Sequence, residues 1–368
     1  MALTQVQPGM LASDSQYTGF KNRIINGAMV IDQRNAGASV TPTANTDFWA
    51  VDRFGTYNTQ GSKFTIQRNA GSVTPPPLFT NYLGVTSTSA YSVSTSDFFK
   101  IYQYIEGFNT ADLGWGTANA QSVTLSFWVR SSLTGTFGGT LINSAANRTY
   151  PFSYTILSAN TWEQKSVTIT GDTTGTWVGA TNGIGLRVNW SLGAGSTVSG
   201  TAGAWSGSYF EGVTGATSVV GTNGATFYIT GVQLEKGSTA TSFDYRPYGT
   251  ELQLCQRYLP AWRFDQSTNA YGFSGQAYST TAALIILPFN VPARVKATGV
   301  VVSDPSHFGI LNTAATALNA GSSVTYNQGS QYALMLGVAG ASGVTAGSAT
   351  LFAGTNTSGY IYATGCEL

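Results

Sequence analysis

The chain has 368 residues with 17 basic and 16 acidic side chains, so that 9% of it is charged while 12% is aromatic. Disordered chains are rich in charge and poor in aromatic residues, so this composition predicts folded domains, and the length is sufficient for two. No run of basic residues is present to neutralise phosphates, and no apolar stretch reaches the ~18 residues of a membrane helix, so we expect neither nucleic-acid binding nor membrane insertion.

The N-terminal residues 1–22 are polar and irregular, and they predict an arm that docks on a neighbouring protein rather than a folded unit. An Asn-Gly pair at 26–27 is typical of a turn. Met29, Ile31 and Gln33 then alternate with their neighbours, which predicts the first strand.

Residues 23–247 carry strand signals separated by turn residues, which predicts a jelly-roll β-sandwich. In the clearest strand, residues 122–130, every second side chain is apolar, and we expect this strand to pair with residues 162–170. The Gly-rich and Ser-rich residues 191–226 predict a long loop or loosely paired strands. The other predicted strands of this domain include 64–68, 98–105, 184–188 and 227–234.

Residues 248–264 are predicted to link this domain to a second one through the only helix of the chain, at 250–260. Thr250 would cap the helix and Pro260 would end it. Residues 265–368 carry strand signals without a helical period, so they predict a second, smaller all-β domain and give an all-β fold class overall. The predicted strands of this domain are 271–273, 284–289, 296–302, 323–326, 332–338 and 360–363.

The sequence shows no constellation of catalytic residues. The single histidine, His307, follows Asp304 and Ser306 within one turn, and neighbours on a turn rarely face one another as a catalytic triad must. Two cysteines, Cys255 and Cys366, are too few for a disulfide framework or a metal site. We therefore expect no enzyme activity, no metal and no cofactor.

Three segments resemble tail-fibre and appendage proteins of tailed bacteriophages, notably those of cyanobacterial and other environmental phages. They are residues 21–37 (KNRIINGAMVIDQRNAG), residues 48–54 (FWAVDRF) and residues 229–258. They bracket a region that is similar to the jelly rolls of carbohydrate-binding modules. The resemblance implies a homotrimeric structural protein of the virion that is synthesised in the host cytoplasm.

The same resemblance implies a role for each part of the chain. The arm, residues 1–22, would dock on the phage tail or baseplate, and the jelly roll would form the body. The domain at 265–368 would be a distal tip that binds a host-surface polysaccharide during adsorption. Two alternatives remain: a non-adhesive virion component, such as a baseplate part, capsid decoration or head fibre, and a capsule depolymerase.

Arg34 and Asp52 are charged residues among apolar strand positions, in a chain that has few charges. We expect them to form an ion pair, because bidentate bonds between arginine and a carboxylate fix geometry well. This pair would have a structural role and would orient the first strand.

Aromatic side chains are the leading candidates for a binding site, because the C–H faces of sugar rings stack on Trp and Tyr. One set lies in the Gly-rich region 189–212, and the other lies among Ser, Asn and Gln in the second domain. The alternative for each residue is a place in a core or in a trimer interface. The carbohydrate-binding candidates are Trp190, Trp205, Tyr209 and Phe210 in the first domain and Tyr271, Phe273, Phe308, Tyr326 and Tyr332 in the second.

Overall fold

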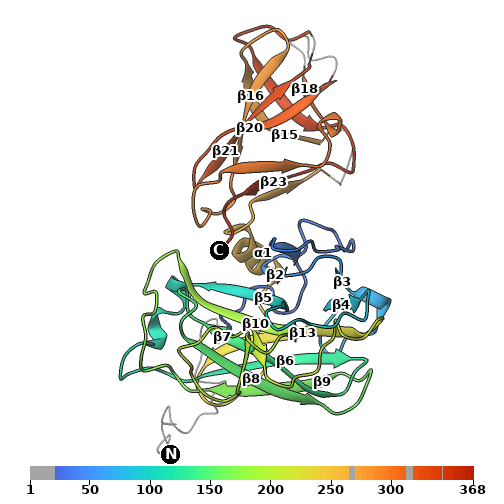
Figure 1. Ribbon diagram of the computed structural model, residues 1–368. Coiled ribbons are helices and arrows are strands. Elements are labelled where there is room, and N and C mark those ends of the chain that lie inside the picture. Colours follow the sequence, from blue (N-terminus) through green and yellow to red (C-terminus); the bar gives the residue numbers. More distant parts are fainter. Residues whose placement is uncertain (1–20, 265–269, 312–317, 342) are drawn as a thin grey trace, which may run out of the picture. The chain divides into compact units, whose positions relative to one another are not determined.

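The computed structural model describes residues 21–264, 270–311, 318–341 and 343–368, so most of the predicted arm at 1–22 lies outside the described residues. The chain divides into two compact units, of which the first ends at Glu251 and the second runs from Leu252 to Glu367. Both units are built almost entirely from antiparallel sheets (Figure 1), so the predicted all-β class is confirmed. In the described part of the chain, no helix is long and apolar enough to cross a membrane.

The first unit is a sandwich of two sheets, and the chain crosses repeatedly from one sheet to the other, as expected for a jelly roll. One sheet has the order β1 (Phe48–Val51), β2 (Phe54–Asn58), β5 (Phe98–Glu106), β10 (Ile184–Ala194), β7 (Gly135–Ile142), β8 (Thr149–Ile156). The other has the order β3 (Phe64–Arg68), β4 (Leu83–Ser87), β13 (Thr226–Lys236), β6 (Val123–Ser131), β9 (Glu163–Ile169). The loops carry the short parallel pair β11 (Ser199–Gly200) and β12 (Gly212–Val213) and the 3-10 turns η3 (Ala70–Ser72), η4 (Gly107–Asn109) and η5 (Ala111–Leu113).

The two sheets bury their apolar sides against each other, and β6 shows how the sequence specifies this. Its alternate residues Val123, Leu125, Phe127 and Val129 are fully buried. Burying a side chain of this size contributes about 1.5–3 kcal/mol. β6 pairs with β9 along its length, for example Leu125 with Val167, so the predicted pairing of these two strands is confirmed.

The predicted strand at 29–33 is wrong, because residues 29–32 are irregular and a turn begins at Gln33. Asn26 and Met29 have left-handed backbone conformations, with φ of 61° and 58°. The side-chain amide of Asn26 binds both backbone groups of Ile31, its N–H at 3.0 Å and its carbonyl at 2.8 Å, which removes them from any strand ladder. The alternation of Met29, Ile31 and Gln33 therefore reports burial and not strand backbone.

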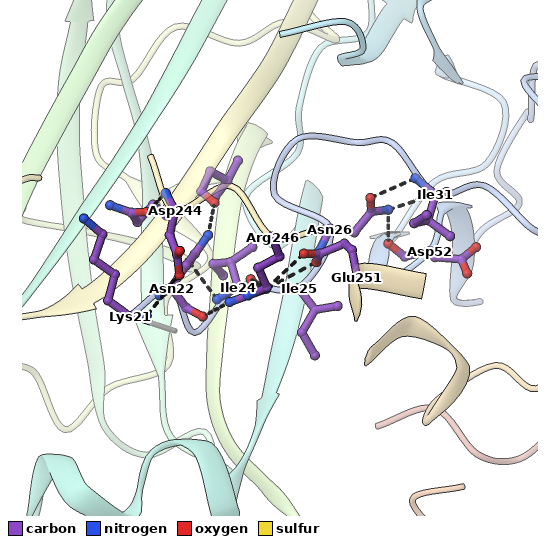
Figure 2. Close-up of polar contacts among 12 residues, drawn as sticks. Lys21, Asn22, Ile24, Ile25, Asn26, Ile31, Asp52, Asp244, Arg246 and Glu251 are labelled. Carbon is purple, nitrogen blue, oxygen red and sulfur yellow. Dashed lines mark hydrogen bonds and ion pairs between the residues drawn. The ribbon is translucent and has the colours of Figure 1, made fainter. Parts of the chain in front are cut away.

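The segments that carry the phage resemblance meet in one polar network (Figure 2). Backbone hydrogen bonds of 2.9 Å join Arg23 N to Leu234 O and Val232 N to Gly27 O. A Cβ atom at Gly27 would lie 2.1 Å from the Val232 carbonyl oxygen, so this close approach requires glycine. Asn26 connects the remaining segment, residues 48–54, by donating to the Asp52 carbonyl at 2.9 Å.

Arg246 and Glu251 form an ion pair at the centre of this network, with 3.2 Å between Nη1 and Oε2 and both side chains almost buried. Arg246 also donates to the carbonyl of Ile24 at 3.1 Å and to that of Asn22, and Glu251 accepts from the backbone N–H of Asn26. A buried ion pair needs such additional hydrogen bonds to offset the loss of hydration. The network fastens the start of the first unit to its end.

The helix α1 (Tyr248–Gln256) begins two residues before the predicted cap Thr250. Its first turn follows Pro247, whose carbonyl accepts from Glu251 N at 3.0 Å, and the fixed φ of proline favours a helix start. The helix ends four residues before Pro260, where the amides of Tyr258 and Leu259 both donate to the Cys255 carbonyl at 3.0 Å.

The second unit contains two sheets and a separate apolar core. The smaller has the order β14 (Ala261–Arg263), β23 (Tyr360–Thr364), β17 (Gly299–Val302). The larger has the order β19 (Leu318–Ala320), β18 (Phe308–Leu311), β22 (Ala349–Gly354), β15 (Ala270–Ala277), β16 (Ala282–Pro288), β21 (Ala333–Ala339), β20 (Ser323–Gly329), and η6 (Pro305–His307) precedes β18. Leu287, Leu336 and Phe352 are fully buried between these strands.

Candidate functional site

The outer side of the six-stranded sheet carries a row of cross-strand neighbours that point away from the core. Trp49 on β1 lies opposite Gly55 on β2, Gly55 opposite Tyr102 on β5, and Tyr102 opposite Asn189 on β10. The adjacent row, which contains Ile101 opposite Trp190, points into the core. We call the outer side over β1, β2 and β5 the aromatic face, defined by Trp49, Tyr57, Phe98, Tyr102 and Tyr104.

The rings of the aromatic face contact one another directly. Tyr102 stacks on Tyr104 with ring centroids 4.4 Å apart and meets Trp49 edge-on at 5.5 Å, while Tyr57 stacks on Phe98 at 5.8 Å. A Cβ at Gly55 would lie 2.7 Å from the Tyr102 ring, so glycine allows this ring to lie over β2. Tyr102 is fully buried by its neighbours, whereas the other four rings remain partly exposed.

A buried charge cluster lies beside these rings. The carboxylate of Glu211 is completely buried, and it accepts from Lys100 Nζ at 2.6 Å, from Asn189 Nδ2 at 2.6 Å and from the Tyr209 hydroxyl. The Lys100 ammonium also lies 5.3 Å from the Phe98 ring centroid and 5.5 Å from that of Tyr102, a cation–π arrangement. Charge pairing and ring contacts together hold the polar and aromatic groups of the site in place.

The segment that contains Glu211 covers one half of this sheet side. β12 packs against β7, β8 and β10. Glycines permit the contact, because a Cβ at Gly212 would lie 2.7 Å from the Ala194 side chain and one at Gly138 would lie 2.5 Å from that of Val213. The half over β7 and β8 is therefore covered, whereas four rings of the aromatic face over β1, β2 and β5 remain partly exposed.

Two tyrosines at this site have perturbed acidities. Burial raises the pKa of Tyr104, although the positive charge of Arg187 opposes this effect. Burial also raises the pKa of Tyr209, and the negative charge of Glu211 and the hydrogen bond to it add to the increase. Both hydroxyls therefore stay protonated in neutral and mildly alkaline solution, and that of Tyr104 can donate to a ligand.

The four candidates predicted in the first unit occupy different environments. Trp190 is fully buried between Phe54 and Phe127, so a ligand cannot reach it and its role is in the core. Trp205 is half-buried against Trp115 and Trp177, and its indole N–H donates to the Thr170 carbonyl at 2.7 Å.

Of the other two, Phe210 packs over Gly200, where a Cβ would lie 2.5 Å from its ring. Tyr209 is the one candidate of this group that the structure brings to the site, through its hydrogen bond to Glu211.

The candidates in the second unit do not form one site. Phe308 is fully buried and stacks on Phe352, so it belongs to the core. Phe273 and Tyr326 are partly buried against the same core, and the Tyr326 hydroxyl donates to the Ala297 carbonyl at 2.9 Å. Tyr332 is 66% exposed and available to a ligand. The side chain of Tyr271 lies outside the described residues.

The predicted pair of Arg34 and Asp52 stays a prediction. The Asp52 carboxylate is buried and accepts from the backbone and the side chain of Gln33, at 2.9 and 2.5 Å. The guanidinium of Arg34 lies over the Trp49 ring, 5.4 Å from its centroid. Both residues therefore support the segment that carries the aromatic face.

The possible catalytic groups are engaged in local structure. Asp304 caps η6 by accepting from Ser306 N at 2.8 Å and Ser306 Oγ at 2.7 Å, and His307 Nδ1 lies 3.0 Å from Ser303 Oγ. This is the geometry of a turn and not that of a triad. Among the described residues, no three His, Cys, Asp or Glu side chains gather as they would around a metal ion. Cys255 and Cys366 are buried free thiols.

A cavity of about 210 Å³ lies beside the polar network of Figure 2, lined in part by Ala28, Val30 and Phe243. Its charged wall is formed by Arg246 and Glu251, which bind each other and the backbone of the N-terminal segment. These groups already hold the unit together, so the aromatic face is the stronger candidate for a ligand site.

No known protein family and no curated protein matches the sequence. Among solved structures, the chain is similar to the enzymatically active domain of bacteriophage CBA120 tailspike protein 4, with 10% identity and a TM-score of 0.30 over 59% of this chain and 21% of that one. It is also similar to a carbohydrate-binding module named CBM4, with 13% identity and a TM-score of 0.29 over 58% of this chain and 98% of that one.

A family 11 carbohydrate-binding module from Clostridium thermocellum, in complex with a β-1,3-1,4-mixed-linked tetrasaccharide, is similar at 12% identity and a TM-score of 0.28, over 56% of this chain and 100% of that one. The chain spans about a fifth of the tailspike structure and nearly all of the two modules. At these identities and TM-scores the similarities assign no function, which must be argued from the site itself.

Proposed function

We propose that the first unit binds a glycan on the aromatic face, and that the chain is a tailed-phage virion protein that uses this binding to adsorb to its host. The observation that supports it is the group of four partly exposed rings, Trp49, Tyr57, Phe98 and Tyr104, on the uncovered part of one sheet side. Rings of this kind offer flat apolar surfaces with polar edges, which suits a ligand that has both C–H faces and hydroxyls.

The virion role rests on the sequence resemblance of residues 21–37, 48–54 and 229–258 to tail-fibre proteins. In this proposal the chain is a homotrimeric tail fibre without enzyme activity. Its arm, residues 1–22, attaches to the tail or baseplate, and its second unit forms a distal tip that also contacts the host polysaccharide. The exposed Tyr332 would be a contact residue of that tip.

The test is a glycan array of bacterial surface polysaccharides with the full chain, followed by titration calorimetry of the glycans that bind. We expect Trp49→Ala and Tyr57→Ala each to weaken binding about tenfold, the equivalent of about 1.4 kcal/mol of lost stacking. The matched control is Trp162→Ala, since Trp162 is also half-buried but packs on Tyr82 and Tyr228 of the other sheet.

Three outcomes distinguish the proposed adhesive function from the two alternative functions. Loss of binding in the two aromatic-face variants and not in the control supports the proposal. A folded chain that binds no glycan and does not block phage adsorption favours a non-adhesive virion component. Release of reducing sugars from host capsule would instead identify a depolymerase.

A further inference from the structure

Arg187 lies on the outer side of the six-stranded sheet, next to the aromatic face. It is on β10 directly opposite Tyr104 on β5, and its guanidinium lies 5.5 Å from the centre of the Tyr104 ring. Its Nη2 donates to the Ser144 carbonyl at 2.6 Å, and the side chain is half-buried. The arginine is thus held in a fixed position at the edge of the site proposed to bind a glycan.

The charge of Arg187 is not balanced by a carboxylate, in contrast to other arginines of the same unit. Arg148 makes two bonds of 2.7 Å to Asp172 through Nε and Nη2, and Arg23 makes two bonds of 2.8 Å to Asp112. Among the described residues, Arg187 forms no ion pair, and its Nε is buried without a hydrogen-bond acceptor.

Two acidic groups of this region already have partners. Glu211 accepts from Lys100, Asn189 and Tyr209 and is neutralised by the lysine. Asp47 accepts from the Tyr102 hydroxyl at 2.5 Å. A half-buried guanidinium loses hydration, and its charge-assisted bonds are most favourable with an anionic acceptor. Within the described residues, Arg187 is therefore a cation without a carboxylate partner at the edge of the aromatic face.

We infer that the aromatic face binds an acidic glycan, with Arg187 receiving an anionic substituent of the sugar while the neighbouring rings stack on its C–H face. This inference rests on the proposed glycan binding and specifies its ligand class. Carboxylate, sulfate and phosphate substituents share the required chemistry, because each presents charged oxygens to a planar guanidinium. Tyr104 packs against the guanidinium and against Tyr102, while the other partly exposed rings of the aromatic face would supply the stacking surface.

The experiment compares each acidic glycan that binds on the array with the same glycan after its charge is removed, by esterification of uronic acids, desulfation or dephosphorylation. Polygalacturonate oligomers and their methyl esters serve as the defined pair. Titrations use the full chain as wild type, Arg187→Gln, Arg187→Lys and Arg130→Gln, with thermal melts to confirm folding. Arg130 is the matched control, since it lies over Tyr228 at 5.4 Å with Nε bound to the Asn160 carbonyl, on the other sheet.

We expect Arg187→Gln to weaken binding of the acidic glycan about tenfold or more and to leave the uncharged form unaffected, because only the charge-assisted bond is lost. Arg187→Lys should recover part of the affinity, Arg130→Gln should match wild type, and added salt should weaken only the acidic ligand. Binding restricted to neutral glycans, or acidic binding unchanged in Arg187→Gln, would overturn the inference while leaving the proposed function intact. Binding of no glycan at all would overturn both.

Discussion

Asp97, one residue before β5, shows how a single carboxylate can organise a loop. Its oxygens accept from Thr59 Oγ1 at 2.8 Å, Tyr91 Oη at 2.6 Å, Gln60 Nε2 at 3.2 Å and Ser94 N at 3.2 Å. Burial by itself would raise the pKa of this carboxyl, but the four hydrogen bonds to the ionised form outweigh it and lower the pKa to about 2. The ionised form therefore fixes two loops at the start of β5 in the six-stranded sheet.

This lowered pKa has a definite effect on stability. The unfolded carboxyl titrates near its ordinary pKa of 3.8, so the stabilisation is complete above that pH and is lost as the pH falls towards 2. We expect Asp97→Asn to lower the free energy of unfolding by about 1–3 kcal/mol at pH 7. Urea unfolding at several pH values should show the variant and wild type converging as the pH approaches 2.

The control for this measurement is Asp304→Asn, because Asp304 also accepts from a nearby hydroxyl and amide but lies on an exposed turn. It should change stability by much less. A constant difference between Asp97→Asn and wild type from pH 7 to pH 2 would contradict the assigned role of the carboxylate.

Among the segments of the first unit, residues 21–33 depend on side-chain hydrogen bonds instead of a strand ladder. Asn26 Nδ2 donates to the carbonyls of Ile31 and Asp52 and its Oδ1 accepts from Ile31 N, all while Asn26 itself is fully buried. Removing this amide leaves three buried backbone groups without partners, and each such group costs about 1–3 kcal/mol.

We therefore expect Asn26→Ala to destabilise the first unit by about 3 kcal/mol or more, as measured by chemical unfolding. Asn160→Ala is the control, since Asn160 has a similar left-handed φ of 59° but an exposed side chain. If both variants lose equal stability, the backbone conformation and not the amide network would be the cause.

The alternation of apolar and polar residues predicted most strands of this fold, but it does not always indicate a strand backbone. It identified β6 and its partner β9 because their buried side chains recur at every second position. The prediction failed at residues 29–33, where alternate side chains are also buried but the backbone is held by the Asn26 amide and does not join a sheet. The pattern reports which side chains are buried, whereas the partners of the backbone depend on residues distant in sequence.

The candidate site was less predictable for the same reason. Trp190 and Asn189 are adjacent in β10 but point to opposite sides of the sheet, so a ring in a Gly-rich region proved to be core. The sequence of β5 did indicate the site, since every second residue from Phe98 to Tyr104 lies on the side of the strand that faces away from the core. Glu211 had no local signal, because its partners Lys100 and Asn189 come from other strands.

For the whole molecule, the distribution of charge is the main feature. Residues 308–366 contain no Asp, Glu, Lys or Arg, so the larger sheet of the second unit is nearly without charge. On its outer side Ile286 and Leu351 are 52% and 42% exposed, and the Ile286 neighbour Met335 is partly exposed. Exposed apolar sheet surface without charges favours contact with another protein surface, and identical copies do not repel there.

If this side mediates the proposed homotrimer, charges placed on it should separate the copies. We expect the full chain to be trimeric by light scattering and the double variant Ile286→Lys with Leu351→Lys to shift towards monomer. Thr357→Lys, at an exposed turn of the same unit, should have no effect. A wild-type chain that is monomeric at micromolar concentration would refute the trimer.

If the chain is a tail fibre, as proposed, the ion pair of Arg246 and Glu251 has a mechanical consequence when the fibre is under tension. It ties residues 22–26, where the chain enters the first unit, to residues 246–251, where the chain leaves it. A pulling force between these two points would pass through this short set of bonds and would bypass the strands of the sandwich. In the proposed role, the first unit would therefore transmit load through these bonds while its six-stranded sheet remains undeformed.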